Sequence, residues 1–292
     1  MSHSQLYLNL AVNGLVEGLI IAMAALGITL VYAVAKFPNA ATGDFMTFSA
    51  YTAKGASVLA GGSLVFGAGV AVLASALLAA LAYLLIFRRL AGRKLVAPLV
   101  VSIGLAFLIR NTLTFFVGTD PTVLPVPIVR AVEVGGIFLQ PLDLAVAAGA
   151  AISLAAAFIV LHKTPIGRRM RAVAGNADLA RVSGIRAGRV MLQLWLLVGM
   201  LAAVAGVLLA AKSVIEPEMG WHLLLPAFAA AILGGVGSPI GALVGGVLIG
   251  LAQELSVPLV GSTYKAAVGF VVILVVLLVR PSGLLGRDRS VR

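Results

Sequence analysis

The stretch LVFGAGVAVLASALLAALAYLLIF, residues 64–87, contains no charged side chain. A helix that crosses the hydrocarbon core of a bilayer needs roughly 20 consecutive apolar residues. In lipid, every backbone N–H and C=O group must be hydrogen-bonded within the protein, and a helix achieves this inside one segment. The stretch therefore predicts a membrane-spanning helix and places the chain among membrane proteins.

Similar apolar segments lie on both sides of this stretch. The long segment 222–257 is broken by GGVGSP at 234–239, which predicts two short crossings or a re-entrant pair. We expect an all-α polytopic membrane helical bundle with about eight to nine hydrophobic segments, some broken or re-entrant, that forms one domain over residues 1–292. The expected segments are 9–34, 41–60, 64–87, 97–117, 143–161, 191–211, 222–257 and 262–279.

The composition agrees with a protein whose main solvent is lipid. Of the 292 residues, 61% are hydrophobic and only 11% are charged, whereas a soluble domain has about 25% charged residues. The net charge of +11 sits in short blocks between apolar segments, so membrane topology explains it and nucleic-acid binding is not expected. The first residues lack a basic region, so we expect the first span to be retained rather than cleaved.

Catalytic and metal-binding motifs are absent from the sequence. There is no cysteine, and the three histidines have no ligand spacing, so no metal site or cofactor is expected. No HExxH, no G-x-S-x-G and no His/Asp/Glu cluster occurs, so no catalytic residue is predicted. We therefore do not expect an enzyme.

Lys and Arg residues fall in three blocks that the positive-inside rule places in the cytoplasm. The loops 118–142 and 212–221 are mostly acidic and are expected outside. This arrangement places the C-terminal tail in the cytoplasm and, if 41–60 crosses, the N-terminus outside. The blocks are Arg88, Arg89, Arg93 and Lys94; Lys163, Arg168, Arg169, Arg171, Arg181, Arg186 and Arg189; and Arg280, Arg287, Arg289 and Arg292.

The loop 163–189 carries the caps of two short helices. Thr164 suits an N-cap, and Pro165 suits the first helical position. Gly175 can end this helix, and Asn176 can cap a second one that ends at Gly184. A structured loop between two spans favours a docking surface for a cytoplasmic partner, and a solvated basic loop is an equal alternative on these grounds.

The run PIGRRMRAVAGNADLARVSGI, residues 165–185, resembles the cytoplasmic coupling loop of branched-chain amino acid ABC permeases. It follows that family's pattern at Gly167, Arg168, Arg171, Ala172, Val173, Ala174, Asn176, Ala180, Gly184 and Ile185. Further similar segments lie at 12–34, 38–45, 102–111, 118–121, 219–254 and 268–287, so the resemblance covers nearly the whole chain. The sequence departs from the family's pattern at Glu17, Thr42 and 48–51. These positions lie near the expected translocation path, so the departures affect the identity of the solute more than the fold.

The resemblance implies a type II ABC importer permease in the bacterial cytoplasmic membrane. Such a permease pairs with a second related permease, two ABC ATPase subunits and an extracytoplasmic solute-binding protein. It moves a small-molecule solute across the lipid bilayer, here branched-chain or related amino acids, and 163–189 is the loop that couples it to the ATPases. Independently, the sequence has no G-x-x-x-x-G-K-[ST], so ATP hydrolysis belongs to another chain.

Polar residues and glycines inside the apolar segments are candidates for the translocation path. A charge such as Glu17 or Arg110 costs about 2.5–3.5 kcal/mol at mid-membrane, so it needs a partner or a water-filled cavity. The alternative for Glu17 is a structural contact with Asn13, and the alternative for Asp44 is a helix cap. The path candidates are Asn13, Glu17, Asn39, Asp44, Ser102, Asn111, Gly234, Gly235 and Gly237.

Two other patterns concern packing and anchoring. Small residues at Gly237, Gly241 and Gly245, and at Gly246 and Gly250, form ridges that let helices approach closely, more often within one chain than between subunits. Trp195 and Trp221 fit anchors at the membrane interface.

Two alternative functions are open. The first is an ABC permease of the same superfamily for urea, amides or sugars. The second is an ion-driven secondary transporter, which calls for several intramembrane carboxylates, and the segments offer only Glu17, Asp44 and Glu254.

Overall fold

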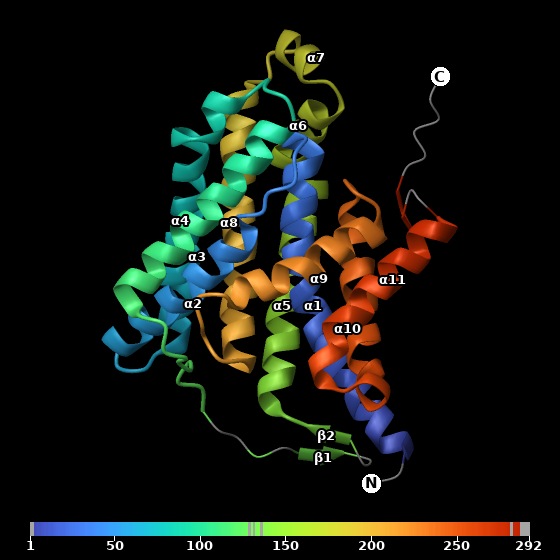
Figure 1. Ribbon diagram of the computed structural model, residues 1–292. Coiled ribbons are helices and arrows are strands. Elements are labelled where there is room, and N and C mark those ends of the chain that lie inside the picture. Colours follow the sequence, from blue (N-terminus) through green and yellow to red (C-terminus); the bar gives the residue numbers. More distant parts are fainter. Residues whose placement is uncertain (1–2, 128–129, 131, 135–136, 281–282, 287–292) are drawn as a thin grey trace.

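The computed structural model describes residues 3–127, 130, 132–134, 137–280 and 283–286 and shows a helical bundle (Figure 1). The helices are α1 (His3–Ala35), α2 (Thr42–Leu59), α3 (Leu64–Leu85), α4 (Val96–Val117), α5 (Pro141–Lys163), α6 (Pro165–Gly175), α7 (Ala177–Val182), α8 (Ala187–Lys212), α9 (Met219–Gly234), α10 (Pro239–Val260) and α11 (Lys265–Val279). Two short 3-10 helices, η1 (Phe87–Leu90) and η2 (Ser262–Tyr264), and an antiparallel hairpin of β1 (Val132–Val134) and β2 (Ile137–Leu139) complete the described elements.

Six of the described helices are long and apolar enough to cross a membrane. They are Gln5–Ala35, Leu64–Leu90, Val96–Val117, Pro141–Lys163, Ala187–Lys212 and Pro239–Val260, and Met219–Gly234 and Ala267–Val279 are apolar but shorter. The all-α prediction is confirmed apart from the β1–β2 hairpin, whereas the count of eight to nine segments is not confirmed. The break expected inside 222–257 is confirmed, because α9 ends at Gly234 and α10 begins at Pro239.

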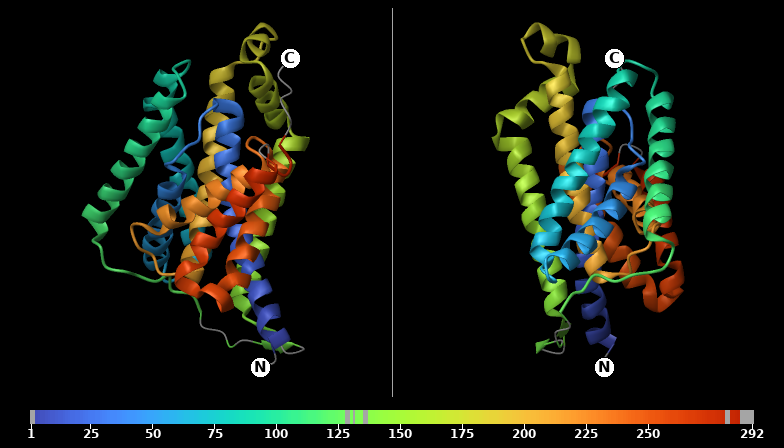
Figure 2. Two further views of the ribbon diagram at one scale, coloured as in Figure 1. Left: turned by 45° about the vertical axis from the view of Figure 1, so that its right-hand side comes forward. Right: turned by 90° about the vertical axis from the view of Figure 1, so that its left-hand side faces the viewer.

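The two ends of the bundle carry different segments (Figures 1 and 2). Helices α6 and α7 lie at one end, and the start of α1 and the β1–β2 hairpin lie at the other. The loops that follow α4 and α8 meet at this second end, where Thr122 and Ile215 exchange backbone hydrogen bonds of 2.9 and 2.6 Å. The basic loop 163–189 is thus opposite the acidic loops, as the charge pattern predicts. Of the C-terminal basic block, Arg287, Arg289 and Arg292 lie outside the described residues.

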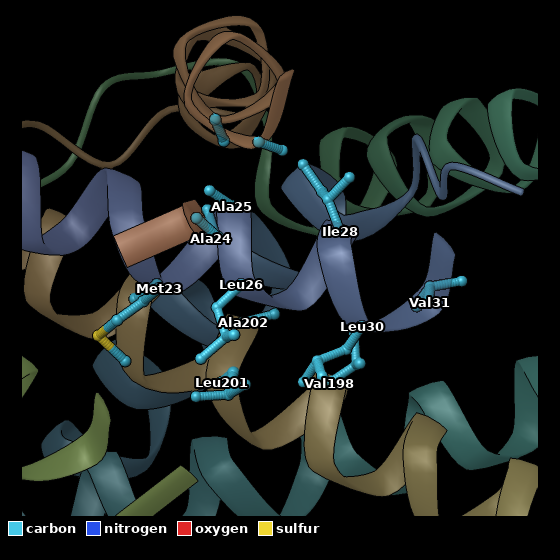
Figure 3. Packing of buried hydrophobic residues seen from close by; sticks show 14 of the residues in the cluster. Met23, Ala24, Ala25, Leu26, Ile28, Leu30, Val31, Val198, Leu201 and Ala202 are labelled. Carbon is cyan, nitrogen blue, oxygen red and sulfur yellow. The ribbon is translucent and has the colours of Figure 1, made fainter. Parts of the chain in front are cut away.

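Helix α1 is the central element of the bundle. In its most apolar 18-residue stretch, 78% of the residues are buried inside the protein, against 28% in the corresponding stretches of α4 and α5. A helix that is apolar on all sides belongs in the interior. Figure 3 shows Leu26 and Leu30 of α1 directed toward Val198, Leu201 and Ala202 of α8, and all five side chains are buried.

Helix α10 approaches its neighbours so closely that only glycine fits at the contacts. Its Gly246 and Gly250 lie against the backbone of Ala22 and Gly18 of α1, where an added Cβ would overlap main-chain atoms. On another face, Gly241 and Gly245 lie against the backbone of α9. Both small-residue ridges therefore pack within the chain, which confirms the intramolecular alternative; Gly237 lies in the α9–α10 turn instead and makes no such contact.

The connection between α1 and α2 is irregular backbone buried inside the bundle. Asn39 accepts a hydrogen bond from the Ala41 N–H, and Ser102 of α4 accepts one from the Ala40 N–H at 3.1 Å. The Thr42 hydroxyl donates to the Asn39 carbonyl at 3.0 Å. Non-helical backbone at membrane depth is tolerated where protein groups satisfy it, and these side chains do so here.

The prediction that Trp195 is an interfacial anchor is wrong. Its side chain is fully buried and stacks on Phe87, with 4.5 Å between the ring centroids. The Phe87 ring in turn stacks on Phe37 at 5.3 Å, so the tryptophan belongs to an aromatic core that joins η1, α8 and the segment after α1. Hydropathy alone does not distinguish a buried tryptophan from an interfacial one, because both lie near the end of a span.

We expect Gly250→Ala to destabilise the bundle by about 1–3 kcal/mol, because overpacking a tight contact between two backbones forces α1 and α10 apart. The matched control is Gly104→Ala in α4, where an added Cβ meets no other atom within 4 Å. Alanine has the higher helix propensity, so this control should be neutral or slightly stabilising. Thermal unfolding of the purified variants in one detergent measures both. Equal melting temperatures for the two would contradict the packing argument.

Candidate functional site

A charged pocket with a volume of about 370 Å³ lies between α1, α5, α8, α10 and α11. It lies toward the end of the bundle away from α6 and α7, since Gln140 precedes α5 and Lys212 and Ser213 lie where α8 ends. Ile20 and Leu209 supply apolar walls. The remaining lining residues are polar or charged: Asn13, Glu17, Gln140, Asp143, Lys212, Ser213, Glu254 and Lys265.

Five ionisable groups in this pocket form two sets of ion pairs. The Lys265 ammonium donates to both carboxylate oxygens of Glu17 at 3.0 and 3.1 Å and to Glu254 at 2.9 Å. The Lys212 ammonium lies 2.7 Å from an Asp143 carboxylate oxygen. With three carboxylates and two ammonium groups, the pocket presents charges of both signs.

The structure gives Glu17 a different partner from the one expected. Its carboxylate pairs with Lys265, which is 248 residues away in the sequence, rather than with Asn13. Asn13 lines the same pocket, so the structure does bring these two path candidates together. Sequence analysis missed Lys265 and Asp143. The signal for Lys265 was the need of the mid-segment carboxylate of Glu17 for a cation, but nothing in the sequence selects which lysine supplies it.

A second buried ion pair joins α2 and α4. The Arg110 Nε–H donates to the Asp44 carboxylate at 3.0 Å, and Asp44 is completely buried. The guanidinium lies 5.4 Å from the centre of the Phe107 ring and 4.8 Å from that of Trp221, so aromatic faces shield it. Helix α2 begins at Thr42 as expected, but Asp44 does not cap it: its carboxylate neutralises Arg110 instead.

The other path candidates are not brought to the charged pocket. Asn39 and Ser102 hold the buried connection before α2, as described above. Asn111 is exposed on the bundle surface and donates to the Phe107 carbonyl one turn earlier. Gly234, Gly235 and Gly237 belong to the α9–α10 turn, where Gly234 contacts Gly241 and both Gly235 and Gly237 have positive φ.

The loop 163–189 forms the two capped helices that its sequence predicts. The Thr164 hydroxyl accepts from the Gly167 N–H, and the Asn176 side chain accepts from the N–H groups of Asp178 and Leu179 at 3.0 Å. Gly184 has a φ of +79°, as a residue that follows a helix end requires.

Helix α6 is fixed to the end of α5. A Cβ at Gly167 would overlap the Leu161 carbonyl, and the Arg171 guanidinium donates to that same carbonyl. Of the other matched loop residues, Ala180 is buried and Ile185 is half-buried, while Arg168, Ala172, Asn176 and Gly184 are exposed.

Two apolar side chains at the tip of this loop are exposed, and sequence analysis did not single them out. Leu179 is 64% exposed and Val182 is 87% exposed, both on α7. They lie three positions apart in the sequence, beside the exposed Arg181. Among the described residues, no group of three or more His, Cys, Asp or Glu side chains could hold a metal ion.

Comparison with known proteins gives matches that span the chain. The family model "Branched-chain amino acid transport system / permease component" matches residues 10–278. The chain is 30% identical to the high-affinity branched-chain amino acid transport system permease protein BraD of Pseudomonas aeruginosa, with 96% of each chain covered. It is 31% identical to the corresponding permease protein LivH of Escherichia coli, with 98% of each covered. A shorter match, 38% over 140 residues, relates 44% of the chain to the ribose import permease protein RbsC of Bacillus subtilis.

One chain of a solved structure, PsaBC from Streptococcus pneumoniae in complex with Fab, aligns with 92% of this chain and 91% of its own length. The TM-score is 0.49 and the sequence identity is 14%.

We expect Asp44→Asn to destabilise the protein by about 3–5 kcal/mol, because it leaves the Arg110 charge buried and unpaired. The double variant Asp44→Asn/Arg110→Gln should recover much of that loss, since no isolated charge remains. The exposed pair of Asp178 and Arg181, 3.5 Å apart, is the control, and Asp178→Asn should cost less than about 1 kcal/mol. Thermal unfolding of these three variants and the unmodified chain in detergent measures this. A double variant no more stable than Asp44→Asn would contradict a coupled pair.

Proposed function

The chain belongs to the branched-chain amino acid transport system permease family, and on this premise we propose how its parts act in transport. It is a membrane-embedded permease subunit of an ABC importer, and partner ATPase subunits hydrolyse the ATP. Its solutes are branched-chain or related amino acids. The observation that carries the mechanism is the capped helix pair α6–α7, which projects from one end of a bundle of apolar helices and is fixed to α5.

In the proposed assembly, the chain pairs with a second related permease. Two ATPase subunits lie on the cytoplasmic side of the membrane, and a solute-binding protein lies on the outer side. Helices α6 and α7 face the cytoplasm, because the arginine-rich loop 163–189 lies there under the positive-inside rule. The loops after α4 and α8 then face outward, and the C-terminus is cytoplasmic. This orientation requires α9, α10 and α11 together to make an odd number of crossings.

The exposed face of α7 is the proposed contact with an ATPase. Leu179 and Val182 offer the apolar contact that the partner would bury, and Arg168 and Arg181 are exposed nearby in the sequence. ATP-driven movement of the ATPases would shift α6 and α7 and so rock the helices between inward-facing and outward-facing states.

The charged pocket is the proposed outer part of the translocation path, with Asn13 and Glu17 on its wall. A zwitterionic amino acid carries one ammonium and one carboxylate group, and the pocket offers groups of both signs beside the apolar side chains of Ile20 and Leu209. The Lys212 ammonium has one carboxylate partner and donors to spare, so it can bind a solute carboxylate.

The match to a ribose import permease keeps a sugar as the second candidate solute, but it covers only 44% of the chain. The full-length matches favour an amino acid. They also favour an ABC permease over an ion-driven secondary transporter.

We expect Val182→Glu to uncouple ATP hydrolysis from uptake, because it places a charge in the apolar contact with the ATPase. Loss of a central contact residue typically costs about 2 kcal/mol, roughly 30-fold in affinity. The control is Val123→Glu, which is 64% exposed in the loop after α4 at the opposite end. The readout is solute-stimulated ATPase activity in reconstituted vesicles. Normal stimulation of ATPase activity by the solute in Val182→Glu would show that α7 does not form the contact with the ATPase.

Substitutions at Arg171 or Gly184 test the fold of the loop rather than its contact with the ATPase. Arg171→Glu and Gly184→Trp should also uncouple the transporter. Arg171 holds α6 to the Leu161 carbonyl and Gly184 has positive φ, so both changes alter the loop's own fold. Val182→Glu leaves that fold in place.

We expect Glu17→Gln to reduce uptake by roughly tenfold or more without lowering the amount of protein in the membrane. A hydrogen bond to a charged group contributes about 1.5–3 kcal/mol, and the amide removes that charge from the pocket wall. The control is Glu218→Gln, an exposed glutamate in the loop before α9. Unchanged transport kinetics in Glu17→Gln would exclude Glu17 from the path.

A further inference from the structure

A second and larger cavity lies at the α6–α7 end of the bundle, well separated from the charged pocket. Its volume is about 830 Å³. It is bounded by the end of α1, the α3–η1–α4 connection, α6, α7 and the first turns of α8. The proposed transport cycle assigns no ligand to it, although Arg181 on its wall also lies beside the proposed contact with the ATPase.

The charge of this cavity is of one sign. Arg88 and Arg93 lie on one side, in η1 and the turn after it, and Arg181 and Arg186 lie on the other, in and after α7. No carboxylate is among its lining residues. Arg181 has an ion pair with the exposed Asp178 at 3.5 Å, and in the described part of the chain the other three guanidinium groups pair with no carboxylate. Four arginine residues on the wall of one concave surface suit an anionic ligand.

The interior of the cavity is apolar. Leu90, Ile185 and Met191 line it with partly exposed apolar side chains. Phe37, Tyr83 and Phe87, each 5% exposed, and the fully buried Trp195 support this wall. Tyr83 and Trp195 stack with 6.3 Å between ring centroids, and Phe87 stacks between Trp195 and Phe37. A preformed apolar wall beside several arginines suits a ligand that has an anionic head and an apolar body.

The cavity also lies at a defined depth. Its residues come from the terminal turns of α1, α3, α4 and α8, each of which is a candidate membrane span, and from the basic loops that follow them. This is the level at which spans leave the hydrocarbon and lipid headgroups begin. Basic pockets between membrane helices on the cytoplasmic side bind lipid headgroups.

We propose that this cavity binds the phosphate headgroup and proximal acyl chains of an anionic phospholipid. The phosphate oxygens accept hydrogen bonds from arginines on both sides, and the apolar chains lie on the apolar wall. A bound lipid would then bridge the α3–α4 connection to α7 and the start of α8. The proposal is independent of the transported solute.

The test is lipid binding by the purified full-length chain in detergent, measured as the rise in melting temperature and by native mass spectrometry. The probes are cardiolipin, phosphatidylethanolamine, and inorganic phosphate at matched phosphate concentration. We expect cardiolipin alone to raise the melting temperature. The variants Arg88→Gln/Arg93→Gln and Arg181→Gln/Arg186→Gln should each bind it roughly 30-fold more weakly, from about 1 kcal/mol for each arginine.

The matched control is Arg169→Gln/Arg189→Gln, which removes the same charge from exposed positions at the same end that do not line the cavity. It should bind cardiolipin as the unmodified chain does. Equally weakened cardiolipin binding in the control would mean that general surface charge causes the effect, and it would overturn the proposal. An equal response to phosphatidylethanolamine, or to inorganic phosphate alone, would overturn it as well. So would a cavity that binds no lipid and is occupied only by an ATPase subunit in the assembled transporter.

Discussion

The structure depends on direct contact between helix backbones. Helices α1, α9 and α10 meet through Gly18, Gly241, Gly245, Gly246 and Gly250, with no side chain between the main chains. Within a bilayer, apolar side chains gain nothing by leaving lipid for protein, so close packing and internal hydrogen bonds must hold the helices together. This close approach brings α10 and α11 to α1, and with them it brings Glu254 and Lys265 to Glu17.

Local features of the fold were predictable from the sequence. Apolar runs define the spans, and Thr164, Asn176 and Gly184 define the loop helices, because both signals act between residues a few positions apart. Pairings between distant segments were not predictable. Glu17 and Arg110 each required an opposite charge, but only the packing of the helices selects Lys265 and Asp44 among the available groups. Trp195 was misplaced for the same reason, since its burial comes from Phe87 and Phe37.

The two cavities differ in how their charges are balanced. In the pocket at one end, Lys265 and Lys212 are each paired with carboxylates. A small polar ligand can therefore replace one member of an ion pair without leaving an unpaired charge. At the α6–α7 end, the arginines line the cavity without acidic partners in its wall. The same bundle therefore has an amphoteric site at one end and a purely cationic site at the other, which suits ligands of different chemistry.

The continuity of α1 has a mechanical consequence. The Lys36 ammonium, directly after α1, donates to the Ala174 carbonyl of α6 at 2.8 Å, and Glu17 lies 19 residues earlier on the same helix, or roughly 28 Å at 1.5 Å per residue. The helix is continuous from Glu17 to its end at Ala35. In the proposed cycle, a displacement of α6 would therefore act on one continuous helix. It would reach the distant pocket as a shift or rotation of that helix rather than through a series of side-chain rearrangements.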